Sequence, residues 1–191
     1  AGTLEKLNVD YGTLRKINPM IISCSITGFG SSGPYKNRPA YDIIIQALSG
    51  GMSITGDPPP ARAGLPVADL TGGMLAVQGI LAALYARERT GSGQRVEVSL
   101  LDGQISLLTY LVADYFISGR ATGPLGIGDR VDPTYQMFKT RDDHIVIAVV
   151  PGSRFWDNLC RAIEREDLIN DPRFCSVGKR KENAVELASI I

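Results

Sequence analysis

Asp69 lies at the start of a strongly apolar stretch, and Gly72 and Gly73 follow it closely. Helix capping is sufficient to explain this aspartate, because an N-cap side chain contributes about 1 kcal/mol of stability. The glycines need another reason, since each costs a helix about 1 kcal/mol relative to alanine. Glycine permits close approach to the backbone, and free N–H groups at a helix start stabilise developing negative oxygen. Asp69 is therefore a candidate nucleophile, with Gly72 and Gly73 as candidate oxyanion donors.

A second glycine pattern, Gly28-x-Gly30-x-x-Gly33, follows an apolar stretch typical of a buried strand. A dinucleotide-binding turn of this spacing needs its third glycine inside a helix whose N-terminus holds the pyrophosphate. Here Gly33 is followed by residues 34–39, which begin and end with proline and are typical of a loop. The pattern predicts a tight loop, and a nicotinamide-dependent oxidoreductase is an outside alternative.

His144 is the only histidine, and it falls in a predicted hairpin turn beside Asp142 and Asp143. A histidine general base needs a pocket and an orienting partner, which an exposed turn does not provide. Serine-hydrolase and metal-hydrolase mechanisms therefore lose their key residue. The three cysteines show no CxxC spacing, so we expect neither a disulfide framework nor a metal site, and we expect a reducing compartment.

The charges of the chain balance, with 20 basic and 20 acidic side chains. This balance predicts no nucleic-acid partner and no anionic-membrane partner. The basic cluster Lys179–Lys181 is expected to be a solvated helix start. No apolar run is expected to reach the length that crosses a bilayer, and 44% hydrophobic residues are ordinary for a globular protein with a core.

Residues 1–120 alternate between helical and strand patterns, which predicts an α/β domain with a mostly parallel, Rossmann-like sheet. The expected helices are Tyr11–Ile17, Tyr41–Leu48, Asp69–Arg89 and Leu100–Ile117, and the expected strands are Met20–Ile26 and Arg95–Ser99. The glycines after Arg89 predict a helix exit.

Residues 121–133 are rich in glycine and predict a linker or glycine loop. Residues 134–191 predict the start of a smaller α+β domain. Its expected elements are a hairpin of Tyr135–Thr140 and Ile145–Val150, a helix from Ser153 to about Ile163, and a helix over Glu182–Ile191.

Taken in order, these segments resemble the class III CoA-transferases (the CaiB/BaiF, formyl-CoA transferase-like family) over nearly the whole chain. The residues that carry the resemblance are Gly2–Leu7, Ile22–Gly30, Ala40–Asp42, Ala68–Gly73, Arg89–Gln94, Tyr135–Thr140 and Asn170–Phe174. The resemblance implies that Asp69 attacks an acyl-CoA thioester, forms a mixed anhydride and then an aspartyl-CoA thioester, and passes CoA to an acceptor acid. Coenzyme A is then a co-substrate, the partners are acyl-CoA and small carboxylic acids, and no metal is needed.

The resemblance also implies CoA contacts. Lys6, with Thr3 beside it, matches a basic position near the CoA phosphates, although a solvated lysine explains it equally. Pro39, Ala40, Tyr41 and Asp42 match a segment that lines the adenine or pantetheine path, although Pro39 could simply mark a helix entry. Gly126 and Gly128 stand where some members have a mobile glycine loop, without the full run of glycines.

Two departures keep alternatives open. The opening strand–helix units of the family are expected before Ala1 and the end of the small domain after Ile191, so this chain is expected to be an internal piece of an interlocked homodimer. A catalytically incomplete CoA-binding fragment is therefore one alternative. The 2-methylacyl-CoA racemases share the aspartate but use a Gly-His-Asp segment, where Ala40-Tyr41-Asp42 stands here. A phenol titrates near pH ~10 and an imidazole near ~6.5, which disfavours racemization. The expected location is cytoplasmic, or an organellar matrix in a eukaryote.

Overall fold

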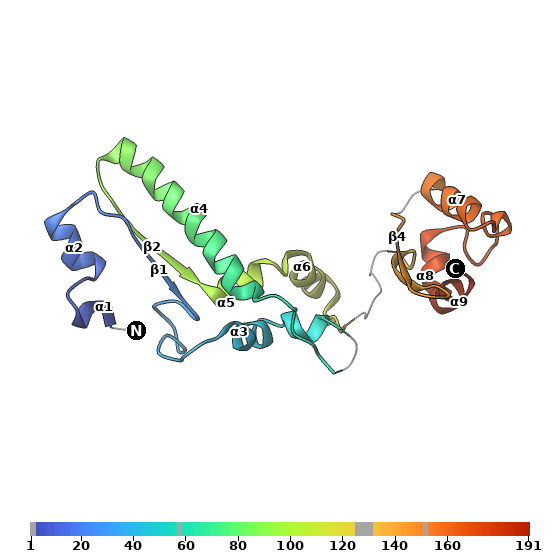
Figure 1. The fold of residues 1–191 in the computed structure, drawn as a ribbon, viewed down its shortest axis with the longest axis horizontal. Coiled ribbons are helices and arrows are strands. Elements are labelled where there is room, and N and C mark those ends of the chain that lie inside the picture. Colours follow the sequence, from blue (N-terminus) through green and yellow to red (C-terminus); the bar gives the residue numbers. More distant parts are fainter. Residues whose placement is uncertain (1–2, 57–58, 125–131, 151–152) are drawn as a thin grey trace. The chain divides into compact units, whose positions relative to one another are not determined.

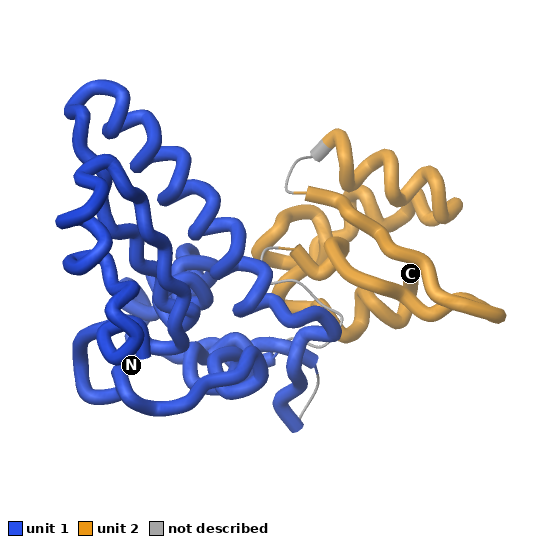
Figure 2. Tube along the Cα trace, turned by 60° about the vertical axis from the view of Figure 1, so that its left-hand side comes forward, with its two compact units in different colours: residues 1–124 blue, residues 125–191 orange. Residues whose placement is uncertain are grey.

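A computed structural model describes residues 3–56, 59–124, 132–150 and 153–191. The chain divides into two units, Ala1–Pro124 and Leu125–Ile191, which are coloured separately in Figure 2. Gly126 and Gly128, the candidate glycine loop, lie outside the described residues.

The centre of the first unit is a parallel strand pair. Strand β1 (Ser23–Thr27) runs beside β2 (Arg95–Ser99), with Ser23 opposite Arg95 and Thr27 opposite Ser99. Parallel neighbours need a long crossover, and here it contains α3 (Asp42–Leu48), the 3-10 helix η1 (Gly51–Ile54) and α4 (Val67–Thr90). The expected α/β class is confirmed by this parallel pair with its helical crossover (Figure 1).

Helix α4 lies along the strand pair and runs in the opposite direction (Figure 1). Near its N-terminus, a Cβ built at Gly72 would lie 2.3 Å from Leu100 Cδ2, just after the end of β2. Further along the helix, a Cβ at Gly79 would lie 2.5 Å from Val96 Cγ1. Near its other end, Arg87 Nη1 donates to the carbonyl of Met20, before β1 begins. The first turn of α4 therefore lies at the carboxyl ends of both strands.

Gly72 and Gly73 have opposite surroundings, which gives a matched pair of substitutions. Gly72→Ala is expected to lower the free energy of unfolding by about 1–3 kcal/mol, because its Cβ overlaps Leu100. At Gly73 an added Cβ meets no atom of the described residues within 4 Å, so Gly73→Ala is expected to stabilise the helix by up to about 1 kcal/mol. Urea unfolding of both variants measures this contrast, and equal effects would contradict the close packing of α4 on Leu100.

The remaining helices of the unit are α1 (Thr3–Lys6), α2 (Tyr11–Ile17), α5 (Leu100–Ser106) and α6 (Thr109–Ser118). The expected single helix over Leu100–Ile117 is wrong, because α5 and α6 are separate and inclined by 69°. At the break, the Leu107 and Leu108 N–H groups bond to carbonyls three residues back. The Ser106 hydroxyl also donates to the Gly103 carbonyl at 2.7 Å, a back-bond that bends helices.

Helix α4 corrects another expectation. Its 24 residues are long and apolar enough to cross a bilayer by length and composition, although no run of this length was expected. Ala68, Thr71, Gly72, Ala76 and Ala83 of this helix are buried. These small side chains and the close contacts with β2 and α5 make α4 the layer that covers the strand pair.

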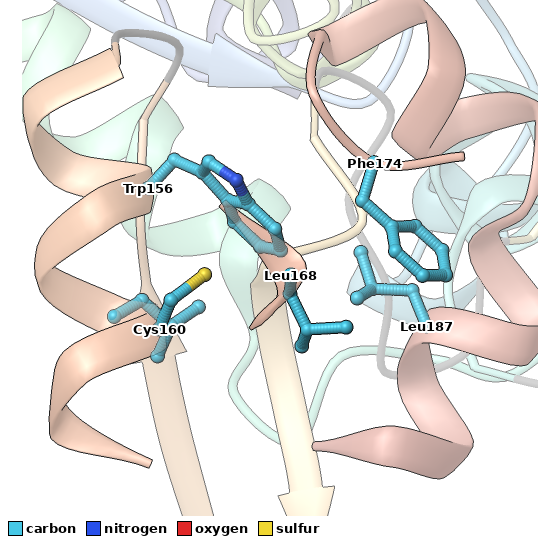
Figure 3. Close-up of a cluster of buried hydrophobic side chains, with 6 residues drawn as sticks. Trp156, Cys160, Leu168, Phe174 and Leu187 are labelled. Atoms are coloured by element: carbon cyan, nitrogen blue, oxygen red, sulfur yellow. The ribbon is translucent and has the colours of Figure 1, made fainter. Parts of the chain in front are cut away.

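The second unit consists of a hairpin and short helices. Strand β3 (Tyr135–Lys139) pairs antiparallel with β4 (His144–Ala148), as the sequence predicts. The helices are α7 (Ser153–Ala162), η2 (Glu166–Leu168), α8 (Val177–Glu182) and α9 (Ala184–Ile190). Their buried core contains Trp156, Leu159, Cys160, Leu168, Phe174 and Leu187 (Figure 3). Burial among these apolar groups raises the pKa of the Cys160 thiol to about 11, so the thiol stays protonated at neutral pH.

Arg180 contradicts the expected solvated helix start. It is 2% exposed and donates from Nη2 to Asp132 Oδ2 at 3.1 Å and from Nη1 to the Phe174 carbonyl at 3.0 Å. Its guanidinium also lies 4.7 Å above the Trp156 ring. Asp132 Oδ1 in turn accepts from the N–H and the hydroxyl of Thr134. The buried charge of Arg180 is thus paired, hydrogen-bonded and stacked.

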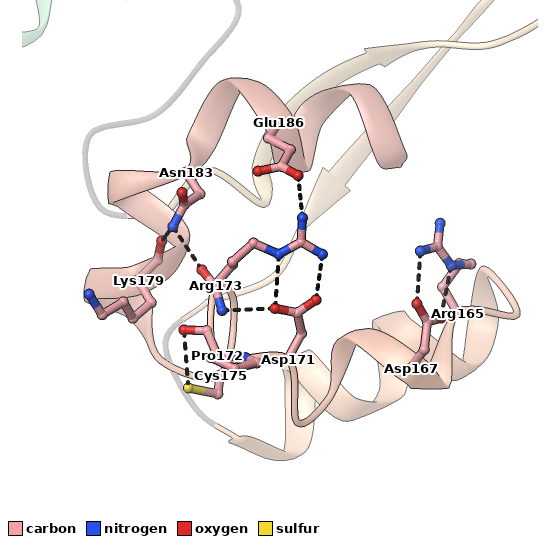
Figure 4. A network of polar contacts seen from close by, with 9 residues as sticks. All are labelled: Arg165, Asp167, Asp171, Pro172, Arg173, Cys175, Lys179, Asn183 and Glu186. Atoms are coloured by element: carbon pink, nitrogen blue, oxygen red, sulfur yellow. Dashed lines mark hydrogen bonds and ion pairs between the residues drawn. The ribbon is translucent and has the colours of Figure 1, made fainter.

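An outer ion-pair network ties the loop before α8 to α9 (Figure 4). Arg173 donates two hydrogen bonds to the Asp171 carboxylate, at 3.0 and 2.6 Å, and also pairs with Glu186. These Arg173 bonds lower the pKa of Asp171 to about 2.

The Asp171 shift gives a pH prediction with a definite sign. Asp171 has a lower pKa in the folded protein than its unfolded value of about 3.9, so its ionised form stabilises the native state. This contribution is fully present above about pH 3.9 and is lost as the pH falls toward 2. Carboxyl-carbon NMR titration is expected to show Asp171 titrating about two units below an unperturbed aspartate. In Arg173→Gln the Asp171 midpoint should return toward 3.9. An unchanged midpoint would contradict the assigned cause.

Candidate active site

Asp69 is the third residue of α4, which begins at Val67. The expected N-cap role is wrong, because Pro66 occupies the cap position and provides no side-chain hydrogen bond. The Asp69 side chain is exposed, and no described residue forms a hydrogen bond or ion pair with its carboxylate. A carboxylate in this state is accessible to an electrophile.

The first turn of α4 is capped from another helix. Asp42, in the first turn of α3, accepts a hydrogen bond from the Ala68 N–H to Oδ1 at 2.8 Å. This bond satisfies one of the N–H groups that every helix start leaves unpaired, and it places negative charge where the helix dipole favours it. Because Asp42 performs this task, the Asp69 side chain is free for chemistry.

The surroundings of Asp69 are the carboxyl edge of the strand pair. Its neighbour Ala68 is buried in a core cluster with Ile45 and Leu100. The backbone closes the same edge, since the Leu101 N–H donates to the Gly28 carbonyl at 3.0 Å, just after β1. Ligands of open α/β sheets bind outside the carboxyl ends of the strands, so Asp69 has the position of a ligand-facing group.

Gly72 and Gly73 lie in the second turn of α4, not in its first turn. In a regular α-helix their N–H groups bond to the carbonyls four residues back, those of Ala68 and Asp69. The premise of the oxyanion role, free glycine N–H groups, is therefore wrong, and Gly72 instead permits close packing on Leu100. Among the described residues none accepts from the Asp69 N–H, so this group is the available backbone donor at the helix start.

The segment Pro39–Asp42 reaches the same edge. Ala40 packs against the core cluster of Ile45 and Ala68, and a Cβ at Gly28 would lie 2.2 Å from Ala40 Cβ. The glycine pattern is thus a loop, as predicted, because Gly30 and Gly33 both have φ near 81° and the next helix after Gly33 is α3, which starts at Asp42. Pro39 is exposed and Tyr41 is 75% exposed, while Asp42 is buried.

The structure does not connect α1 to this edge by hydrogen bonds. Thr3 and Lys6 are both exposed, and in the described parts of the chain neither side chain bonds to Pro39–Asp42 or to the start of α4. The described residues also contain no group of three or more histidine, cysteine, aspartate or glutamate side chains placed to hold a metal ion.

Sequence reasoning missed Gln46. This side chain is 3% exposed and donates from Nε2 to Asp42 Oδ2 at 2.7 Å and to the Leu65 carbonyl at 3.2 Å. Its Oε1 accepts from the Ala63 N–H at 2.9 Å. The signal that could have revealed it is the Asp42–Gln46 spacing, because residues four apart share one face of a helix.

Comparisons with known proteins agree with this arrangement. A sequence family described as CoA-transferase family III matches residues 1–191. The chain is 39% identical to the succinate–glutarate CoA-transferase of Agrobacterium fabrum over 98% of this chain and 47% of that protein. It is 38% identical to the acetyl-CoA:oxalate CoA-transferase of Acetobacter aceti over 95% of this chain and 47% of that protein. The chain thus spans about half the length of these relatives.

Solved structures give the same result. A CaiB/BaiF family protein from Brucella suis superposes with a TM-score of 0.84 at 34% identity, covering 99% of this chain and 50% of that one. A hypothetical protein from Mycobacterium tuberculosis superposes with a TM-score of 0.85 at 30% identity, covering 98% and 50%.

Proposed function

This chain belongs to CoA-transferase family III, and we propose that the protein containing it moves CoA from an acyl-CoA donor to a carboxylic acid acceptor, with Asp69 as the nucleophile. One observation carries the assignment of the nucleophile. At the carboxyl edge of the strand pair, the Asp69 carboxylate is exposed and unpaired among the described residues, while Asp42 caps the helix in its place.

The chemistry follows from a free carboxylate. An Asp69 oxygen attacks the thioester carbonyl of the donor, the C–S bond breaks, and CoA leaves as a thiolate. The thiolate then attacks the Asp69 carbonyl carbon of the anhydride and releases the donor acid as its carboxylate. An acceptor carboxylate attacks the resulting aspartyl-CoA thioester, and the freed thiolate takes the acceptor's acyl group from the second anhydride. The cycle restores Asp69 without net oxidation or proton transfer, and it divides one difficult exchange into easier steps.

Helix α4 supports the charge changes of this cycle. Each attack makes a tetrahedral centre with a negative oxygen, and the positive end of a helix macrodipole stabilises negative charge nearby. The Asp69 N–H, which has no hydrogen-bond acceptor among the described residues, is a donor at this end. We therefore assign the oxyanion contact to the first turn of α4.

The CoA path is proposed to pass along Pro39–Tyr41, with Lys6 and Thr3 near the phosphates. Two observations support this path. The Tyr41 side chain is exposed, and the next residue, Asp42, is hydrogen-bonded to the first turn of α4, which contains Asp69. The relatives are named for succinate, glutarate, acetyl-CoA and oxalate, and small carboxylic acids are accordingly the proposed donors and acceptors.

The complete protein is proposed to be a homodimer. Helix α4 exposes an apolar row of Leu70, Met74, Val77, Leu81 and Tyr85, each more than half exposed, which needs a cover in the complete molecule.

The test of the function uses the complete protein that contains this chain. Succinyl-CoA is incubated with glutarate or oxalate, and acetyl-CoA with glutarate, oxalate or succinate, and the CoA esters are separated by chromatography. We expect a new CoA ester and the free donor acid in equal amounts. Exchange of the α-proton with solvent deuterium in the absence of any acceptor would instead indicate a racemase. CoA binding without either reaction would indicate a binding protein.

A further inference from the structure

Asp42 and Gln46 form a buried clamp on the segment that leads into α4. Their side chains are 9% and 3% exposed. Together they bond to three backbone groups of this segment: the Ala63 N–H, the Leu65 carbonyl and the Ala68 N–H. Their mutual bond, from Gln46 Nε2 to Asp42 Oδ2, completes the network at 2.7 Å.

Each donor and acceptor in the clamp has a defined partner. An ionised aspartate can accept hydrogen bonds but cannot donate them. The two carboxylate oxygens of Asp42 accept from the Ala68 N–H and from the Gln46 amide. A buried carboxylate that loses such partners pays a large desolvation penalty, so the network keeps one geometry. Hydrogen bonds to a charged group are also stronger and shorter than neutral ones.

The clamp holds the backbone at a fixed place immediately before Asp69. Residues 59–66, the described residues that lead into α4, form neither helix nor strand, and Pro66 gives the helix no side-chain cap. Among the described residues, the side-chain hydrogen bonds that link this segment to the rest of the unit come from Asp42 and Gln46. These two side chains therefore supply the hydrogen bonds that fix the first turn of α4, next to the Asp69 carboxylate, relative to α3.

We infer that Asp42 and Gln46 are positioning residues for the nucleophile, an inference that rests on the proposed role of Asp69. Asp42 acts through the Ala68 N–H and not by touching CoA, because it is buried and its oxygens already serve protein donors. Nucleophilic attack depends steeply on geometry, and a displacement of about 1 Å can cost about 100-fold in rate.

The test alters one side chain of the clamp at a time in the complete protein; changing Gln46 to Glu also leaves the Leu65 carbonyl without its donor. Asp42→Asn retains an acceptor for the Ala68 N–H but places an amide opposite the Gln46 amide. Gln46→Glu places a second carboxylate against Asp42. The double variant restores an amide–carboxylate pair in reversed order. The new amide at position 42 can donate to the new carboxylate at position 46, which still accepts from the Ala63 N–H.

The expected results separate geometry from substrate binding. Each single change is expected to lower kcat by about 10- to 100-fold, because the nucleophile loses its fixed position, with KM for acyl-CoA changed less than about threefold. The double variant is expected to recover part of the loss in kcat.

Gly79→Ala is the matched control, because it destabilises the same unit far from the clamp. A kcat loss in Gly79→Ala equal to that of Asp42→Asn at equal stability would overturn the inference. A rise in KM for acyl-CoA with unchanged kcat would also overturn it, by making Asp42 a CoA contact. A double variant whose kcat is no higher than that of the slower single variant would also overturn the inference.

A readout independent of activity separates this inference from the proposed function. Amide hydrogen exchange of Ala68 is expected to be about tenfold faster or more in Asp42→Ala than in the unsubstituted protein, even without substrate, because the N–H loses its acceptor. If exchange accelerates while the unsubstituted protein shows no transfer, the clamp stands and the nucleophile role fails. If transfer occurs and Ala68 exchange is unchanged, the clamp fails and the function stands.

Discussion

Asp69→Asn is expected to abolish CoA transfer, with kcat reduced by about 1000-fold or more, while the protein remains folded. An asparagine side chain cannot form the anhydride, and losing a covalent nucleophile removes the whole reaction path. Stability should change little, because the Asp69 carboxylate is exposed and is bonded by none of the described residues. The lost interaction with the helix dipole is worth about 0.3–1 kcal/mol. Transfer rates and urea unfolding of the same preparation measure both effects.

Asp102→Asn is the matched control for this substitution. Asp102 is likewise an exposed aspartate at the third position of a helix, because α5 begins at Leu100 with Ser99 as its cap. The control should keep transfer within about threefold while showing a similar small change in stability. Equal loss of activity in both variants would mean that a general effect of charge at helix starts explains the result, and would contradict the role of Asp69.

Arg180→Met is expected to destabilise the second unit by about 3–5 kcal/mol. The substitution leaves Asp132, which is 1% exposed, as a buried charge without its cationic partner. It also removes the donor to the Phe174 carbonyl and the stacking on Trp156. Trp156 is the only tryptophan of the chain, so its fluorescence during urea unfolding reports on this unit.

Lys181→Met, one residue along the same helix, is the control for this change. Lys181 is exposed, and its replacement should alter stability by less than about 0.5 kcal/mol. Replacing both Arg180 and Asp132 with apolar residues should recover much of the loss, because no buried charge then lacks a partner. An Arg180→Met effect under about 1 kcal/mol would contradict the buried pair.

The sequence predicted those features of the fold that depend on neighbouring residues. The strand Arg95–Ser99 and the helix Tyr11–Ile17 have the predicted bounds, and the hairpin of β3 and β4 has the predicted pairing. The prolines after Gly33 correctly excluded a dinucleotide-binding helix, because they leave a loop up to Tyr41. In each case the deciding signal is local: periodicity, proline or a turn.

The failures share a different cause. The N-cap of α4 was misplaced by three residues, at Asp69 and not at Pro66, because the first turn is capped by Asp42, 26 positions before Ala68. Arg180 was expected in solvent because its partner, Asp132, lies 48 positions away. The glycines after Asp69 suggested a ligand contact, whereas Gly72 makes room for Leu100. Local sequence gives no information about such distant partners.

The candidate site was predictable only in part. Asp69 came from its own sequence context as well as from the family resemblance, the segment Pro39–Asp42 came from the resemblance, and the structure brings them together through the Asp42–Ala68 bond. Gln46 was missed because a glutamine inside an apolar helix carries no chemistry by itself. The buried network that explains its presence becomes visible only in three dimensions.

The most direct test of the central claim is chemical trapping of Asp69 in the complete protein. The protein is treated with an acyl-CoA donor and hydroxylamine, digested, and analysed by peptide mass spectrometry, with Asp69→Asn and a sample without acyl-CoA in parallel. The account predicts a hydroxamate on Asp69 that requires the donor and is absent from both controls. A folded protein that binds CoA and transfers it, yet yields no label on Asp69 with any active donor, would contradict the role of Asp69 as nucleophile.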